Sequence, residues 1–157
     1  MNKIFIHTAP AHSGKTTNMF RFAAKNRNVD GILQPVIENK RFLYHIDSRQ
    51  LRLLEVVNHQ NEDDIIKIGN FKFSKETFAW AQKILTDSFQ KKFNWLVIDE
   101  IGPLEIEGKG YEPALSKILL EYEKFNGNIL LVVRKELLEK VKTHYNLGQS
   151  FHKLEVD

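Results

Sequence analysis

The stretch APAHSGKTT, residues 9–17, decides the fold. Loops that hold nucleotide phosphates follow the pattern GxxxxGK[ST], and this stretch ends accordingly in Gly14, Lys15 and Thr16 but begins with Ala9. In such a loop the backbone N–H groups point inward around the anion, the N-terminus of the following helix adds partial positive charge, and the lysine reaches the outer phosphates. Gly14 allows close approach of the backbone, and the Thr16 hydroxyl is a ligand for Mg²⁺. The stretch therefore predicts a phosphate-binding loop.

The context of this loop strengthens the prediction. Residues 3–8, KIFIHT, form a short apolar run typical of a strand, and Met19, Phe22 and Ala23 lie on one face of a predicted helix after the loop. The first position of the loop requires a small residue, so Ala9 is suitable if its φ is negative. By average composition, such a pattern arises by chance in about one chain of this length in a hundred. We assign nucleotide binding to Ala9, Pro10, Ala11, His12, Ser13, Gly14, Lys15, Thr16 and Thr17.

Two carboxylates follow a second buried strand. Residues 95–98, WLVI, form a continuous apolar run, as in a central parallel strand, and Asp99 and Glu100 come directly after it. A carboxylate at this place near a phosphate loop can hold Mg²⁺ through water, so Asp99 and Thr16 are the candidate metal ligands. Glu100 can accept a proton from a water molecule lined up with the γ-phosphate, which hydrolysis requires.

The order of the remaining elements predicts an α/β fold. Strands that alternate with helices indicate a mainly parallel sheet flanked by helices, and the short alternating stretches of residues 31–73 indicate an inserted β-hairpin region. Ser74 is the predicted N-cap of a helix that runs to about Lys92, and Pro113 lies in the first turn of another helix, whose apolar face includes Tyr122. The sequence predicts a loop over residues 102–112, a buried strand over 128–133, a helix over 135–145 and a terminal strand over 152–157. We expect one domain over residues 1–157.

Composition excludes several classes of function. The chain has 157 residues, of which 42% are hydrophobic, and 23 Lys and Arg against 20 Asp and Glu give a net charge of +3, which is too small to indicate nucleic-acid binding. The absence of cysteine excludes disulfides and thiolate metal sites. Nowhere do about 18 apolar residues run together, so we expect no membrane span and a cytoplasmic location.

Three stretches together resemble a known family. They are APAHSGKTT, LVIDEIGPLE and LLVVR, and they resemble the small nucleoside triphosphatase family sometimes called cancer-related nucleoside triphosphatase. The Gly-Pro that follows the two carboxylates in DEIGPLE is the most specific feature. The resemblance implies a P-loop NTPase fold with a catalytic glutamate, and Mg²⁺-dependent hydrolysis of several nucleoside triphosphates (ATP, GTP or others). By this resemblance, Gly14, Lys15 and Thr16 bind phosphate and metal, Asp99 binds the metal, and Glu100 acts on the attacking water.

The chain departs from the family pattern at two places. Ala9 and His12 stand where the family commonly has glycine, and residues 31–38 lack the charged residues expected after the first strand. The second departure bears on the range of substrates, because a specificity element is expected in that region. At His12 we expect the backbone N–H to matter more than the ring.

Four further charged residues each allow two interpretations. Arg134 ends the strand NILLVV, where it either stabilises charge on the transferred phosphoryl group or forms a structural ion pair. Arg41 and Arg52 either reach a substrate, if the hairpin region folds over the site, or lie in solvent. Glu105 either orients the loop after Pro103 or pairs with a lysine.

Two other functions compete with hydrolysis. A small kinase would use the same loop and hold an acceptor in residues 31–73, although Glu100 and the lack of an arginine-rich lid count against it. A nucleotide-dependent switch or accessory protein would bind nucleotide and hydrolyse it slowly until a protein or RNA partner accelerates it. The sequence indicates neither a protein partner nor a preferred base.

Overall fold

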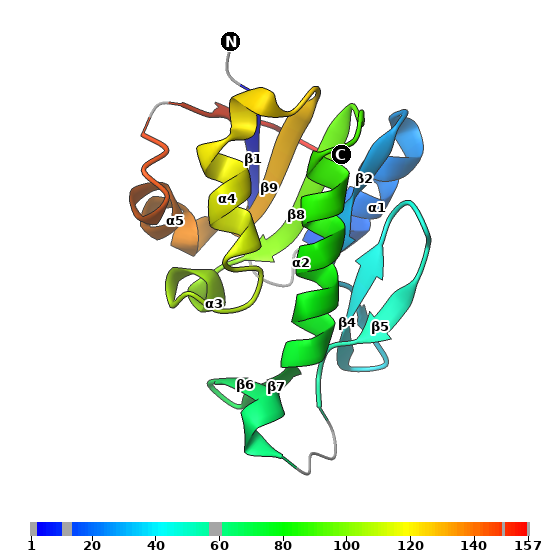
Figure 1. The fold of residues 1–157 in the computed structure, drawn as a ribbon, viewed down its shortest axis with the longest axis vertical. Coiled ribbons are helices and arrows are strands. Elements are labelled where there is room, and N and C mark those ends of the chain that lie inside the picture. The colour runs from blue at the N-terminus through cyan, green and yellow to red at the C-terminus, as the bar shows by residue number, and fades with distance from the viewer. Residues whose placement is uncertain (1–2, 11–13, 57–60, 149, 157) are drawn as a thin grey trace.

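The computed structural model describes residues 3–10, 14–56, 61–148 and 150–156, and Figure 1 shows its ribbon. The strands are β1 (Ile4–Ala9), β2 (Val29–Leu33), β3 (Val36–Ile37), β4 (Lys40–His45), β5 (Leu51–Leu53), β6 (Ile65–Ile68), β7 (Phe71–Ser74), β8 (Trp95–Ile101), β9 (Asn128–Arg134) and β10 (His152–Lys153). The helices are α1 (Lys15–Lys25), α2 (Lys75–Phe89), α3 (Pro103–Ile106), α4 (Ala114–Leu120) and α5 (Leu138–His144), with short 3₁₀ turns at Glu62–Asp64, Tyr122–Lys124 and Lys135–Leu137.

The main sheet is mostly parallel. Its strand order is β10-β1-β9-β8-β2-β4-β3, with β5 also paired to β4, and β6 and β7 form a separate hairpin. The pairs from β10 to β2 are all parallel, whereas β4 runs antiparallel to β2, β3 and β5. The mainly parallel sheet with helices and an added hairpin region is therefore confirmed.

Helices cover both faces of the sheet, α2 and α4 in front and α1 behind in Figure 1. Leu96 and Ile98 of β8 belong to the larger core cluster, which includes side chains of α2, α4 and α5. Val97, between them, belongs to a second cluster with Met19 and Phe22 of α1. This alternation follows from the twofold period of a strand that is buried on both faces, as the apolar run of β8 predicted.

The N-cap of α2 is the one that the sequence predicts. The Ser74 hydroxyl accepts a hydrogen bond from the Thr77 N–H at 3.1 Å. The helix ends at Phe89, slightly earlier than the predicted Lys92. Two expectations further along were wrong: residues 103–106 form the short helix α3 where a loop was expected, and Tyr122 lies in a 3₁₀ turn after α4. Pro103 supplies a preset φ for the first turn of α3, a signal that the prediction of a loop overlooked.

The hairpin region begins later than predicted. β2 pairs in parallel with β8, so the strand at Gly31 belongs to the main sheet, and antiparallel pairing starts only with β4. Asp30 and Gly31 interrupt the apolar pattern of β2, so this strand lacks the continuous apolar run that marks β8. Asp30 is nevertheless buried.

Asp30 is buried because three neighbours stabilise its carboxylate. The Ser88 hydroxyl of α2 donates to Oδ2, the Asp47 N–H donates to Oδ1 at 3.1 Å, and His45 Nε2 lies 2.9 Å from Oδ1. Burial alone would raise the pKa of Asp30, but hydrogen bonds from His45, Ser88 and the Gly31 backbone outweigh it and hold the pKa below its usual value. The carboxylate thus connects β2, the β4 hairpin and α2.

Gly31 allows β2 to approach β8 closely. Its φ is +139°, and a Cβ there would lie 2.0 Å from the Val97 carbonyl oxygen in the backbone of β8. We expect Gly31→Ala to lower the free energy of unfolding by about 3 kcal/mol or more, because overpacking and an unfavourable φ act together. Gly148→Ala is the matched control, since Gly148 also has positive φ (+54°) but open space around it. Urea unfolding measures both, and equal losses would contradict the close approach.

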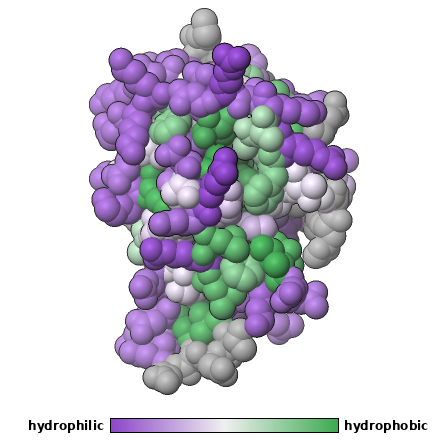
Figure 2. Space-filling view, turned by 90° about the vertical axis from the view of Figure 1, so that its right-hand side faces the viewer, coloured by the Kyte–Doolittle hydropathy of each residue, from purple (hydrophilic) through white to green (hydrophobic). Residues whose placement is uncertain are grey.

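Figure 2 shows one face of the molecule, where apolar side chains run through the middle of the view between polar ones. Large exposed apolar side chains lie on β3, β5 and β7: Val36, Ile37, Leu51, Leu53 and Phe71. Among the described residues, no helix is long and apolar enough to cross a membrane.

Candidate active site

The described residues at the two ends of the predicted phosphate loop lie at the edge of the sheet where the parallel strands end. Ala9, the last residue of β1, is paired with Arg134, the last residue of β9. Ala9 is not among the residues with positive φ, so the condition for an alanine at this position is met. Gly14 is the N-cap of α1, with a φ of +83° that favours glycine. The predicted binding residues Ala11, His12 and Ser13, and the Lys15 side chain, lie outside the described part of the structure.

Thr16 and Asp99 are in direct contact. The Thr16 hydroxyl, in the first turn of α1, donates to Asp99 Oδ2 at 2.8 Å, and the Gln34 N–H donates to the same oxygen at 3.0 Å. Asp99 is fully buried. The two predicted metal ligands, 83 positions apart in the chain, are therefore adjacent, and Gln34 at the end of β2 fixes the carboxylate from the other side.

A bulge in β8 sets the direction of Glu100. Ile98 pairs with Leu131 and Ile101 with Val133, so β8 has one more residue than β9 between these pairs. Glu100 has a φ of +60°, in the left-handed region that costs a non-glycine residue about 1–3 kcal/mol. Such backbone is typical of functional sites, because it aims one side chain out of the regular alternation.

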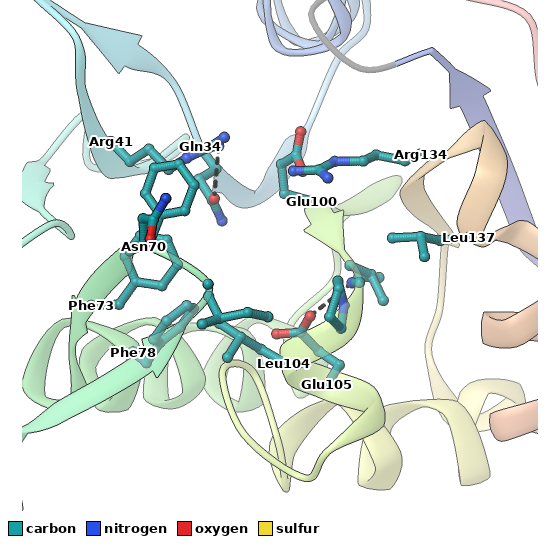
Figure 3. Close-up of a pocket in the computed structure, with 16 residues that line it drawn as sticks. Gln34, Arg41, Asn70, Phe73, Phe78, Glu100, Leu104, Glu105, Arg134 and Leu137 are labelled. Carbon is teal, nitrogen blue, oxygen red and sulfur yellow. Dashed lines mark hydrogen bonds and ion pairs between the residues drawn. The ribbon is translucent and has the colours of Figure 1, made fainter.

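Glu100 faces Arg134. Arg134 Nε lies 3.7 Å from Glu100 Oε2, and the side chains of Glu100 and Arg134 are 14% and 35% exposed. Two of the three predicted catalytic side chains, Glu100 and Arg134, thus lie at one end of a cavity, where Figure 3 shows them pointing toward each other. The ion pair leaves open both interpretations of Arg134, since a partly exposed arginine can also contact a phosphate.

Glu105 lies within α3 and holds the backbone before and after this short helix, which favours an orienting role over a pair with a lysine. Its carboxylate oxygens accept hydrogen bonds from the N–H groups of Gly102 at 2.8 Å and Tyr111 at 3.1 Å. Burial raises the pKa of Glu105 from 4.5 to about 7, against the opposing effect of these two N–H donors. The Tyr111 ring is fully buried beside this carboxyl group, and burial, with the nearby charges of Asp99 and Glu105, raises the pKa of the Tyr111 hydroxyl.

The raised pKa of Glu105 predicts how stability depends on pH. Between pH 4.5 and 7 the folded chain keeps a proton on Glu105 that the unfolded chain has lost. The contribution of this group to stability therefore falls as pH rises through this window, by about 3 kcal/mol in total. Urea unfolding at pH 5 and at pH 7.5 measures the loss, and Glu105→Gln should remove this component. An identical pH dependence in the parent and the variant would contradict the assignment.

A cavity of about 360 Å³ adjoins Glu100, and Figure 3 shows the residues around it. Its walls come from β8 and the turn into α3, from the end of β9, and from the β6–β7 hairpin, α2 and β4. Arg41 lines this cavity, so the hairpin region does bring one of its two candidate arginines to the site. Arg52 is not brought there, because its guanidinium lies over the Trp80 ring at 4.5 Å to the centroid.

Sequence reasoning missed Gln34 and the aromatic wall of the cavity. Gln34 follows β2 at the edge where ligands bind in parallel sheets, and this position would have been a signal had β2 been recognised as a sheet strand. The β6–β7 residues had no local signal, because their role depends on contacts distant in sequence.

Comparison with known proteins shows the family of this chain. A family model described as NTPase matches residues 3–155. The chain belongs to this NTPase family. Nucleotide binding and NTPase activity are thereby supported at the level of the family, in agreement with the resemblance seen in the sequence. A comparison with curated proteins finds no match.

Two solved structures share the fold of this NTPase family member. The crystal structure of THEP1 from the hyperthermophile Aquifex aeolicus has a TM-score of 0.69 and 12% sequence identity, over 99% of this chain and 90% of that chain. The solution structure of a human cancer-related nucleoside triphosphatase has a TM-score of 0.66 and 16% identity, over 100% and 89% of the two chains. The predicted P-loop NTPase fold is confirmed.

Proposed function

We propose that this chain is an NTPase that hydrolyses nucleoside triphosphates to diphosphates and phosphate with Mg²⁺, as a single domain. The observation that carries the proposal is the contact between Thr16 and Asp99, which joins the phosphate-loop helix to the strand that also bears Glu100. The human neighbour is titled a nucleoside triphosphatase, which agrees with it.

The proposed reaction is attack of water on the γ-phosphorus. The water loses a proton to the Glu100 carboxylate, its oxygen bonds to phosphorus, and the bond to the bridging oxygen of the diphosphate breaks. Backbone N–H groups of residues 11–17 and the Lys15 ammonium hold the phosphates, and Arg134 stabilises the charge that develops on the transferred group. Residues Lys15, Glu100 and Arg134 are the proposed catalytic residues.

Thr16 at the start of α1 and Asp99 in β8 fit Mg²⁺. Thr16 and Asp99 offer a hydroxyl and a carboxylate, oxygen ligands of the kind that Mg²⁺ prefers beside substrate phosphates and water. When bound there, Mg²⁺ would neutralise charge on the phosphate oxygens. The cytoplasmic location stays a prediction from the sequence.

Phosphate release from a panel of triphosphates tests the proposal. ATP, GTP, CTP and UTP are each incubated with the protein, with Mg²⁺ and with a chelator in its place. We expect equal amounts of diphosphate and phosphate from at least one of them, and only with Mg²⁺. Tight nucleotide binding with no turnover in any combination would favour the nucleotide-dependent switch instead.

A further inference from the structure

The cavity beside Glu100 is larger than a water site requires. Its volume of about 360 Å³ lies within the range of roughly 300–1,000 Å³ that small-molecule sites have. It shares two residues with the proposed hydrolytic site, Glu100 and Arg134, while most of its remaining wall is apolar or aromatic. A site for water alone has no need of that apolar wall.

The end of the cavity away from Glu100 has the chemistry of a ring-binding site. Phe73 and Phe78 form the base of this end, and Figure 3 shows the side chains of Asn70, Gln34 and Arg41 at its rim. Carboxamides and a guanidinium offer the donors and acceptors that complement the edge of a heteroaromatic ring, and aromatic side chains offer its faces a stacking surface.

The Gln34 amide is held there by weak contacts. It accepts from Arg41 Nη1 at 3.4 Å and donates to the Tyr111 hydroxyl at 3.5 Å, both at the long end of the hydrogen-bond range. These contacts orient the amide and can yield to shorter ones from a ligand. The backbone of the same residue holds Asp99, so Gln34 forms the partition between the cavity and the proposed metal ligands.

The β6–β7 wall is preformed. The Val56 N–H donates to the Lys72 carbonyl at 2.8 Å, and the Ser74 N–H donates to the Leu54 carbonyl at 2.8 Å, so β7 pairs with the chain that follows β5. The Phe71 and Phe73 rings stack at 5.8 Å between centroids, and the Arg41 guanidinium lies 5.3 Å from the Phe71 centroid. A ligand therefore meets side chains that are already in contact with one another, which lowers the entropic cost of binding.

The position of Glu100 connects this cavity to phosphoryl transfer. A nucleophile attacks the γ-phosphorus from the side opposite the leaving diphosphate, and its proton must reach the base. Because Glu100 lines the cavity, a hydroxyl group presented from the cavity lies next to the same base that serves water.

We propose that this cavity binds a nucleoside, with its base at the Asn70 end and a sugar hydroxyl at Glu100, and that this hydroxyl replaces water as the phosphoryl acceptor. The inference rests on the proposed function. The hydroxyl proton passes to Glu100, the hydroxyl oxygen bonds to the γ-phosphorus, and the bond to the bridging oxygen breaks. The electron pair of that bond leaves with the diphosphate, so the products are a nucleoside monophosphate and a nucleoside diphosphate, with no change of oxidation state.

Two measurements test this inference, and a third tests the proposed function separately. The first is calorimetric titration of adenosine, guanosine, cytidine and uridine into the protein without triphosphate, which tests the cavity whether or not ATP is hydrolysed. The second is ATP turnover in the presence of each nucleoside, in which the amounts of diphosphate, phosphate and monophosphate are compared. Turnover of ATP alone, measured beforehand, tests the proposed function by itself.

We expect saturable binding of at least one nucleoside. In the turnover assay with that nucleoside, we expect less phosphate than diphosphate, and the difference should equal the amount of monophosphate formed. Phe71→Ala should weaken this binding about tenfold or more, because stacking on an aromatic side chain contributes on that order. Leu51→Ala is the matched control, an apolar residue of similar exposure (44% against 43%) outside the cavity, and should bind like the parent.

Four results would overturn the inference. The first three are no binding of any nucleoside, equal effects of Phe71→Ala and Leu51→Ala, and diphosphate always matched by phosphate. Competition between the nucleoside and a non-hydrolysable triphosphate would also overturn it, because the cavity would then be part of the triphosphate site.

Discussion

Glu100→Gln is expected to retain nucleotide binding and to lose hydrolysis by about 10²–10⁴-fold, the usual contribution of a general base. Glutamine preserves the size of the side chain and offers no carboxylate to receive the proton of the attacking water. The measurement is phosphate release under saturating triphosphate, alongside equilibrium binding of a non-hydrolysable analogue.

The bulge at the end of β8 directs Glu100 toward the cavity, so we expect this loss for Glu100 and not for other glutamates nearby. Glu107→Gln is the matched control, because Glu107 is exposed just after α3 and should turn over like the parent. A Glu100→Gln variant that hydrolyses at the parental rate would remove Glu100 from the proposed mechanism.

Lys15→Ala is expected to lose both affinity and turnover. Removing a lysine that pairs with phosphate leaves charge uncompensated, and truncating one partner of such a pair costs about 2–5 kcal/mol, or roughly 30- to 5,000-fold in affinity. Titration with a non-hydrolysable triphosphate measures the loss. Lys25→Ala, at the other end of α1, keeps the loop intact and should bind like the parent. Equal affinities of Lys15→Ala and the parent would contradict the phosphate loop.

The two halves of the candidate site were predictable because each carries a local signal. The pattern from Gly14 to Thr16 lies between an apolar run and a helical pattern, and Asp99 and Glu100 end a continuous apolar run. Parallel strands end at one edge of a sheet, so two motifs that each follow such a strand are expected to lie close together. The 2.8 Å contact between Thr16 and Asp99 agrees with that reasoning.

The other features of the fold and of the site depend on pairing between segments that are distant in sequence. Asp30 is a carboxylate in a central strand, and only its contacts with His45 and Ser88 explain why it is buried there. The bulge that turns Glu100 toward Arg134 arises from register with β9, which the sequence of β8 alone does not specify. The cavity arises where the β6–β7 hairpin comes close to the end of β8, a contact between elements without a shared local pattern.

The central claim is that water, activated at Glu100, attacks the γ-phosphorus of a bound triphosphate. Turnover of ATP in H₂¹⁸O with Mg²⁺, followed by mass spectrometry of both products, tests it most directly. Attack at the γ-phosphorus predicts one ¹⁸O atom from solvent in each phosphate released and none in the diphosphate. Solvent ¹⁸O in the diphosphate, or no release of phosphate under these conditions, would contradict it.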